Sequence, residues 1–234
     1  MNTLKQEKVA GIIGGMGPEA TVDLMQRIIR NTPALGDADH IRCIVDNNPK
    51  IPSRMKALLE NSGEDPGAAM AAMGRRLEAW GADFLAIPCN TAHNYLPDVV
   101  QAVGIPVLDM VDLAVQQARA QKPGLRCAGI MATPMVRITK LYEHRFAPYG
   151  ITVLYAIGDD EQNLFRIIKE VKAGKVTPAL REELLAIKQN MLGQGAEVCI
   201  LACTELGILA QEDANTLDAA EVLAKEIVRL AKSQ

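Results

Sequence analysis

The segment Gly81-Ala82-Asp83-Phe84-Leu85-Ala86-Ile87-Pro88-Cys89 has a counterpart 114 positions later in Gly195-Ala196-Glu197-Val198-Cys199-Ile200-Leu201-Ala202-Cys203. Both copies lead from a glycine through an apolar run to a cysteine, and polar residues follow. A short apolar run bounded by turn residues is typical of a buried strand in a parallel sheet. The segment and its counterpart therefore predict two equivalent strands, each followed at once by a cysteine.

A second internal match indicates the same symmetry. Ala10-Gly11-Ile12-Ile13 followed by Thr21 is similar to Ala128-Gly129-Ile130-Met131 followed by Thr139, with an offset of 118 in a chain of 234 residues. Two matches at nearly the same half-chain offset predict two halves of similar fold.

Short apolar runs alternate along the chain with longer amphipathic segments. The alternation predicts an α/β fold of two pseudo-symmetric Rossmann-like lobes with parallel sheets. We expect strands at residues 9–13, 41–46, 83–87, 105–108, 126–131, 151–155 and 197–201. We expect helices at residues 66–80, 110–121, 161–173 and 178–192, and Pro18 marks the start of another.

Composition narrows the class of protein. The chain is 49% hydrophobic and 23% charged, which suits a globular protein, and its net charge of -3 gives no basic surface for nucleic acid. No stretch approaches the roughly 20 apolar residues of a membrane span, and the polar residues 1–8 do not resemble a secretory signal. The five cysteines form no C-x-x-C pair and no cluster with the three histidines. We therefore expect a cytoplasmic protein with free thiols and no metal, nucleic-acid partner or membrane association.

Cys89 and Cys203 are the candidate catalytic residues. Ligands of open α/β sheets bind beyond the C-terminal ends of the strands, so two such lobes would bring both thiols to one cleft. Racemisation removes a proton from one face of a carbon and returns one to the other, as a thiolate base and a thiol acid on opposite faces can do. A helix start lowers the pKa of a thiol, and short polar side chains there can bind a small anion: Asn90, Thr91 and Thr204. The remaining cysteines fall inside predicted strands and are expected to be structural: Cys43, Cys127 and Cys199.

The Gly-rich turn at Gly14-Gly15 has two interpretations. It is either simply a tight turn or a cradle of backbone N–H groups for a ligand carboxylate, and its spacing is not a clean dinucleotide-binding fingerprint. In the second case Met16 and Thr21 would line or support the pocket.

Two charged or titratable side chains are weaker candidates. His93, four residues after Cys89, either tunes the thiol or caps the turn. Arg54 follows a predicted strand and would suit a carboxylate substrate as a bidentate donor, although most loop arginines are only solvated.

At these residues the chain resembles the aspartate/glutamate racemase superfamily, the cofactor-independent amino-acid racemases. The resemblance covers nearly the whole chain and rests on three motifs: Gly14-Gly15-Met16-Gly17-Pro18-Glu19-Ala20-Thr21, Pro88-Cys89-Asn90-Thr91-Ala92-His93 and Ala202-Cys203-Thr204-Glu205. It implies two similar α/β lobes with the active site in the cleft between them, no cofactor, and a homodimer. Because the last helix of the family returns to the first lobe, the lobes would comprise residues 1–113 plus 215–234, with Cys89, and residues 114–214, with Cys203. Residues 216–232 would form that last helix.

The resemblance also implies a role for each matching residue. The catalytic cysteines match Cys89 and Cys203, and the substrate would be an acidic amino acid. Arg54 and Lys172 match the residues that handle the charges of the substrate, with Lys175 left as an alternative to Lys172. The other expected substrate-binding residues are Met16, Asn90, Thr91, Thr133 and Thr204. The expected supporting residues are Gly15, Thr21, His93 and Glu205.

Departures from the family pattern define the branch. Glutamate racemases have Asp-Ser-Gly where this chain has Gly14-Gly15, and His where it has Glu205, so the chain is nearer to aspartate racemases and their broad-specificity relatives. Ser53, where many aspartate racemases have Asp, leaves the substrate side chain open. The sequence thus predicts an isomerase that interconverts L- and D-aspartate or glutamate. Two alternatives remain: hydantoin racemisation or maleate isomerisation by the same cysteines, and a two-lobed ligand-binding or thiol redox protein.

Overall fold

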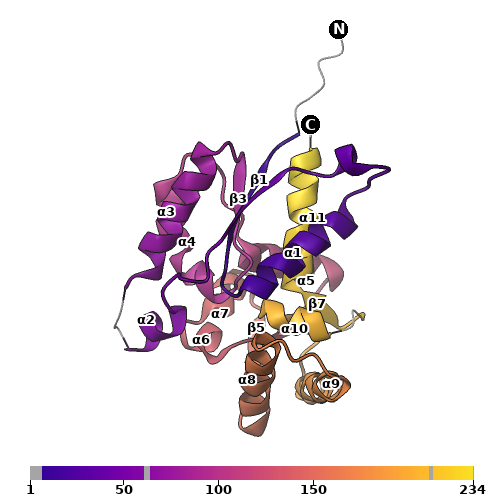
Figure 1. Ribbon diagram of the computed structural model, residues 1–234. Coiled ribbons are helices and arrows are strands. Elements are labelled where there is room, and N and C mark those ends of the chain that lie inside the picture. Colours follow the sequence, from indigo (N-terminus) through magenta and orange to yellow (C-terminus); the bar gives the residue numbers. More distant parts are fainter. Residues whose placement is uncertain (1–6, 61–63, 211–212, 234) are drawn as a thin grey trace. The chain divides into compact units, whose positions relative to one another are not determined.

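The computed structural model describes residues 7–60, 64–210 and 213–233 (Figure 1). The chain forms two compact units. The first comprises residues 1–88, 95–109 and 223–234, and the second comprises residues 89–94 and 110–222. The prediction of a cytoplasmic location used the polar residues 1–8, and residues 1–6 of these lie outside the described residues.

The first unit contains a three-stranded parallel sheet in the order β2–β1–β3. β1 is buried along its whole length, as a central strand covered on both faces should be. Pro18 opens α1, and the Asp65 side chain caps α3 by accepting a hydrogen bond from the Gly67 N–H at 2.8 Å. The elements are β1 (Ala10–Gly14), α1 (Pro18–Asn31), a 3₁₀ turn (Asp37–Asp39), β2 (Cys43–Asn47), α2 (Arg54–Glu60), α3 (Pro66–Ala79), β3 (Phe84–Ala86) and α4 (Leu96–Ala102).

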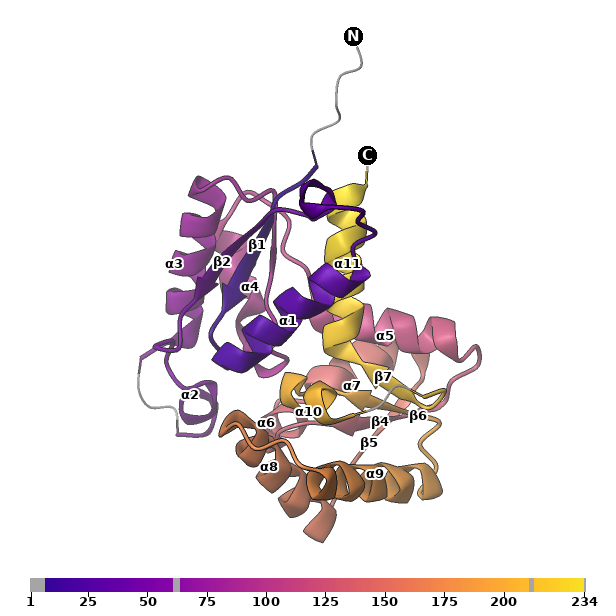
Figure 2. The same cartoon turned by 45° about the vertical axis from the view of Figure 1, so that its right-hand side comes forward.

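The second unit contains a four-stranded parallel sheet in the order β5–β4–β6–β7. Figure 2 shows α8 and α9 side by side beneath these strands. α9 contributes Leu184, Ile187 and Met191 to a core that also contains Cys199 and Leu201 of β6. The elements are a 3₁₀ turn (Thr91–Tyr95), α5 (Met110–Gln121), β4 (Cys127–Met131), α6 (Pro134–Ile138), α7 (Leu141–Phe146), a 3₁₀ turn (Ala147–Tyr149), β5 (Thr152–Tyr155), α8 (Asp159–Lys172), α9 (Pro178–Gly193), β6 (Val198–Leu201), α10 (Thr204–Leu209) and β7 (Thr216–Asp218).

The two sheets confirm the α/β fold with parallel sheets. The central strands, β1 and β4, carry the repeat of offset 118, and their partners β3 and β6 carry the repeat of offset 114. A Cβ added to Gly11 would lie 2.8 Å from Ala82 Cβ, and one added to Gly129 would lie 3.1 Å from Ala196 Cβ. The glycines and their neighbours are equivalent in the repeat, so both sheets use the same close approach at the same place.

One predicted strand is wrong. Segment 105–108 forms only an isolated bridge, in which Val107 pairs with Leu85. Pro106 has no backbone N–H to extend a ladder, which limits the pairing.

The predicted last helix begins three residues later than expected. Residues 216–218 form β7 beside β6, and the helix is α11 (Ala219–Lys232). The carboxylate of Asp218 accepts a hydrogen bond from the Ala220 N–H at 2.9 Å, which caps the helix where the strand ends.

The compact units divide the chain differently from the predicted lobes. Segment 89–94, expected in the first lobe, belongs to the second unit. Its hydrogen bonds reach Met110, Thr133 and Tyr142 of that unit. α11 begins in the second unit and belongs to the first from Leu223 onward.

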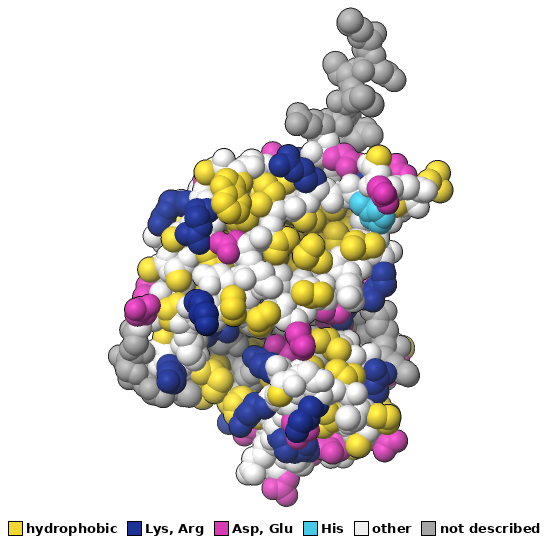
Figure 3. Space-filling view, viewed as in Figure 1, with side chains coloured by type: hydrophobic (Ala, Val, Ile, Leu, Met, Phe, Trp, Pro, Cys, Tyr) yellow, Lys and Arg dark blue, Asp and Glu magenta, His cyan; other side chains and the backbone are white. Residues whose placement is uncertain are grey.

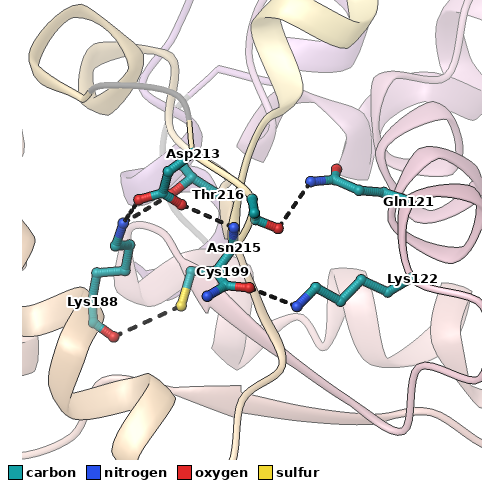
Figure 4. A network of polar contacts seen from close by, with 8 residues as sticks. Gln121, Lys122, Lys188, Cys199, Asp213, Asn215 and Thr216 are labelled. Carbon is teal, nitrogen blue, oxygen red and sulfur yellow. Dashed lines mark hydrogen bonds and ion pairs between the residues drawn. The ribbon is translucent and has the colours of Figure 1, made fainter.

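A buried lysine anchors the segment that leads to β7 (Figure 4). Lys188 of α9 donates hydrogen bonds to Asp213 and, at 3.0 Å, to Thr216 Oγ1. Asp213 also accepts from the Asn215 N–H at 2.9 Å and from Thr216 Oγ1 at 2.8 Å. The hydrogen bond from Lys188 is the main cause that lowers the pKa of Asp213.

The Asp213→Asn substitution is expected to lower the free energy of unfolding by about 1–3 kcal/mol at neutral pH, because it leaves a buried ammonium with a weaker partner. The lower end applies because the Asp213 side chain is 49% exposed. A depressed pKa in the folded state means that this stabilisation is present above the ordinary carboxyl value and is lost as pH falls through the folded value. Urea unfolding should therefore show a difference in the free energy of unfolding between the wild type and the variant at neutral pH. This difference should become smaller below about pH 4.

The control for this substitution is Glu182→Gln, since Glu182 is an exposed carboxylate on the same helix. It should leave the unfolding midpoint unchanged. Equal losses in the two variants, or a difference for Asp213→Asn that persists at acid pH, would contradict the proposed anchor.

The outer face of α1 is partly apolar. Val22 and Ile29 are 50% and 54% exposed, and Met25 lies between them at helical spacing. On the face shown in Figure 3, apolar side chains form patches and basic side chains are interspersed with acidic ones. Within the described ranges, no helix combines the length and the apolar character needed to cross a membrane.

Candidate active site in the second unit

His93 fixes the backbone that follows Cys89. The imidazole is buried, its Nδ1 lies 2.9 Å from the carbonyl oxygen of Cys89, and its Nε2 lies 3.0 Å from the N–H of Met110. Because a carbonyl only accepts and an N–H only donates, Nδ1 carries the proton and Nε2 the lone pair, so His93 is neutral. Both ring nitrogens bond backbone groups, which favours the capping role over the tuning of the thiol.

Asn90 and Thr91 contact the segment of α6 and α7. The Tyr142 hydroxyl donates to Asn90 Oδ1 at 2.7 Å, and Thr91 Oγ1 lies 3.2 Å from Oγ1 of Thr133, the residue before α6. Asn90 is 2% exposed, and its Nδ2 is buried without a hydrogen-bond partner among the described residues. An unsatisfied buried donor costs about 1–3 kcal/mol, so this amide is positioned to bind an acceptor that comes from outside the chain.

Cys203 is the N-cap of α10, and its thiol donates a hydrogen bond to a buried carboxylate. The acceptor is Glu205 Oε2, 2.9 Å from the sulfur, and Thr204 Oγ1 donates to the same oxygen at 3.3 Å. On the other side of the carboxylate, Lys172 Nζ lies 3.5 Å from Glu205 Oε1. Lys172 therefore contacts this cluster, whereas Lys175 lies exposed beyond the end of α8.

The pKa of Cys203 is raised well above the ordinary thiol value. Burial is the largest cause, the Glu205 charge is the second, and Lys172 offsets part of the shift. The expectation that the helix start lowers this pKa is therefore wrong for Cys203, because desolvation and a neighbouring carboxylate outweigh the helix dipole. Cys203 is therefore a thiol and not a thiolate at neutral pH.

Backbone pairing relates the two cysteine segments to each other. The Ala202 N–H donates to the carbonyl of Met131 at 2.8 Å, so Cys203 and Thr133 follow neighbouring strands at the same edge of the sheet. Thr133 in turn contacts Thr91, and the charge of Cys89 contributes to the raised pKa of Cys203. The second unit thus contains nine of the expected site residues: Cys89, Asn90, Thr91, His93, Thr133, Lys172, Cys203, Thr204 and Glu205.

The other expected residues belong to the first unit. Thr21 Oγ1 accepts a hydrogen bond from the Gly15 N–H at 2.9 Å, so this N–H is used inside the turn and the tight-turn interpretation holds there. Met16, the next residue in the sequence after Gly15, is buried. Arg54 opens α2 and donates from Nη1 to the carbonyl of Pro52 at 3.1 Å. The contacts of these four residues with a substrate stay predictions.

The three remaining cysteines fit a structural role. All five cysteines are free thiols. Burial raises the pKa of Cys43 and of Cys199 to about 11, which makes them inert at neutral pH, and Cys127 lies partly buried at the start of β4. In the part of the chain that the structure describes, no group of three or more His, Cys, Asp or Glu side chains is arranged to hold a metal ion.

Nothing in the two cysteine motifs marked Tyr142 as a site residue. The repeat of offset 118 places Leu24 at the equivalent position, and both side chains are fully buried. The change from leucine in one half to tyrosine in the other could have indicated Tyr142, because a buried hydroxyl needs a hydrogen-bond partner and a leucine side chain does not.

Comparisons with known proteins identify the family to which the chain belongs. The Asp/Glu/Hydantoin racemase family model matches residues 13–227. The broad specificity amino-acid racemase RacX of Bacillus subtilis (strain 168) is 25% identical over 227 residues, 93% of this chain and 96% of RacX. The structure of the Picrophilus torridus aspartate racemase is similar with a TM-score of 0.84 and 30% identity, over 96% of this chain and 94% of that one. A putative Asp/Glu racemase from Yersinia pestis shares the fold with a TM-score of 0.80 at 23% identity, over 96% and 99% of the two chains. The chain therefore belongs to the Asp/Glu/hydantoin racemase family.

Proposed function

We propose that the protein is a cofactor-independent amino-acid racemase that interconverts the L and D forms of aspartate or glutamate, with Cys89 and Cys203 as the two acid–base groups. The observation that carries the proposal is a buried thiol, Cys203, which donates a hydrogen bond to Glu205 at 2.9 Å. Burial and the Glu205 charge raise the pKa of this thiol, and Cys89 makes a smaller contribution. The aspartate racemase at 30% identity supports an acidic substrate, and RacX, a broad-specificity enzyme, defines the range to be tested.

The proposed reaction balances with the two sulfur atoms alone. Cys89 as a thiolate removes the α-proton from one face of the substrate, and the electron pair moves into the carboxylate to form an enediolate-like intermediate. Cys203 then gives its proton to the other face of the α-carbon. The enzyme ends with Cys89 as a thiol and Cys203 as a thiolate, which is the state that runs the reaction in the other direction.

The α-proton of an amino acid is weakly acidic, so the growing charge on the carboxylate oxygens must be stabilised. The two hydrogens on Asn90 Nδ2 are buried donors without a partner among the described residues. Donors of this kind are worth most when they act on charge that develops in the transition state. We assign Asn90 this role, with the hydroxyls of Thr91 and Thr133 beside it.

Chiral chromatography tests the proposed function. The purified protein, without added pyridoxal phosphate, should form the opposite enantiomer from L-aspartate or L-glutamate. A panel of neutral amino acids, a 5-substituted hydantoin and maleate separates this activity from the alternative chemistries of the same cysteines. Turnover of hydantoin or maleate alone, or of no compound in the panel, would reject the proposal.

Glu205 is expected to set the upper limit of the working pH range. Activity needs one thiol and one thiolate, so kcat/KM falls at high pH as Cys203 loses its proton. The Glu205 charge raises the pKa of Cys203, and Glu205→Gln should therefore move the alkaline limb of the kcat/KM profile to lower pH. Glu143→Gln is the control, because Glu143 is a carboxylate of the same unit that accepts a hydrogen bond from the Tyr155 hydroxyl. This variant should leave the alkaline limb of the kcat/KM profile in place. An alkaline limb that stays fixed or moves upward in Glu205→Gln would contradict the role of Glu205.

We also propose that the protein works as a homodimer in the cytoplasm. The exposed apolar stripe of Val22, Met25 and Ile29 on α1 supports a partner surface.

A further inference from the structure

The Asn90 side chain is held at one end only. Its Oδ1 accepts a hydrogen bond from the Tyr142 hydroxyl at 2.7 Å, whereas its Nδ2 is buried without a partner among the described residues. An amide can present either its oxygen or its NH₂ group, and the two ends differ in charge. The partner at the fixed end therefore decides which end faces a ligand.

Tyr142 is itself rigidly placed. Its side chain is fully buried, and its ring packs against Phe146 of the same helix with centroids 6.3 Å apart and an angle of 29° between the rings. It is the second residue of α7, which follows Lys140 in a left-handed conformation with φ of 51°. A hydroxyl on a buried ring has little freedom to follow a rotating amide, so the ring fixes the amide and not the reverse.

We propose that Tyr142 is a positioning residue of the racemase: its hydroxyl holds Asn90 Oδ1, and both Nδ2 hydrogens thereby face the substrate carboxylate. This inference rests on the proposed function and adds to it the group that orients the donor. Without the hydroxyl, the hydrogen bond that selects one orientation of the amide is lost, and in the reversed orientation the amide oxygen meets the negative carboxylate and repels it. The repulsion grows as charge develops, so the transition state is affected more than the bound substrate.

The test is the Tyr142→Phe variant, which keeps the ring and removes the hydroxyl. We expect kcat/KM for the preferred amino acid to fall by about 10- to 100-fold, mostly in kcat rather than KM. Tyr155→Phe is the matched control, because it removes a partly buried phenol hydroxyl of the same unit whose hydrogen bond, at 2.8 Å, goes to Glu143 and not to Asn90. Its kcat/KM should stay within about twofold of the wild type.

A double-mutant cycle separates positioning from a merely structural effect. In an Asn90→Ala background there is no amide to orient, so Tyr142→Phe should cause no further loss of kcat/KM. Losses that multiply independently, or a Tyr142→Phe enzyme as active as the wild type, would overturn the role of Tyr142 and leave the racemase intact. A wild-type protein that racemises no amino acid would overturn the proposed function and this role with it.

Discussion

Cys89→Ser and Cys203→Ser will each lower kcat for racemisation by at least about a thousandfold, the largest effect that we expect of any single substitution. A serine hydroxyl is far too weak an acid to exist as the alkoxide base at neutral pH, and as a proton donor it is much weaker than a thiol. In the proposed mechanism the two sulfur atoms act on opposite faces of the α-carbon, so neither can replace the other. Each loss alone therefore stops inversion.

The two variants should nevertheless differ in one respect. Each keeps one thiol, so each should slowly exchange the α-proton for solvent deuterium in one enantiomer only, and the two variants should label opposite enantiomers. Cys127→Ser is the control, since Cys127 is a free, partly buried thiol in a strand of the same unit. It should racemise at close to the wild-type rate. Either cysteine variant with near-full turnover would reject the two-base assignment.

Gly15→Ala will lower the free energy of unfolding by about 3 kcal/mol or more, the largest expected effect on stability. Gly15 has a φ of 96°, which costs an L-residue about 1–2 kcal/mol. In addition, an added Cβ would lie 2.2 Å from the backbone carbonyl group of Asn48, which cannot rotate away as a side chain could. Thermal and urea unfolding of the two proteins measure the difference.

Gly36→Ala is the matched control for this substitution. Gly36 has an extended backbone with φ of -163°, and an added Cβ would meet nothing within 4 Å. Alanine there should be neutral or stabilise the fold by a few tenths of a kcal/mol through the unfolded chain. A Gly15→Ala protein that unfolds at the same midpoint as Gly36→Ala would show that the turn after β1 is not constrained as described.

The parts of the fold that could be predicted are those that local patterns of residue types indicate. The repeated strand–cysteine units and the glycines at equivalent positions are visible as residue types at fixed spacing, and the sheets reproduce them in the same strand order. β7 could not be predicted in this way, because three residues carry no periodicity and only the pairing with β6 makes them a strand. Its anchor, the buried Lys188, depends on a tertiary contact with Asp213.

The family could be predicted from the sequence motifs, whereas the electrostatics around Cys203 could not. The cysteines and their polar followers could be named from the motifs, and the family and the isomerase class are confirmed. The predicted direction of the pKa shift at Cys203 was wrong. The direction depends on how deeply tertiary packing buries the sulfur and on the rotamer of Glu205, and neither can be read from local sequence. Tyr142 was missed for a similar reason, since its partner lies 52 positions away in the chain.

The two halves also differ in a way that matters for the chemistry. By the repeat of offset 114, Thr91 and Glu205 occupy equivalent positions after their cysteines. A hydroxyl that contacts Thr133 stands in one half, and a carboxylate that binds the thiol stands in the other. One fold used twice therefore gives the two thiols different surroundings, as the proposed acid and base roles require.

Racemisation in heavy water tests the central claim most directly. The wild-type protein, without added cofactor, is incubated in D₂O with L-aspartate or L-glutamate. The enantiomers are separated by chiral chromatography, and their deuterium content is measured by mass spectrometry. A proton taken by one cysteine as thiolate and a deuteron given by the other as thiol should yield D-product with one deuterium at the α-carbon from its first appearance. D-product without deuterium, or no D-product from either amino acid, would contradict a pair of thiols acting on opposite faces.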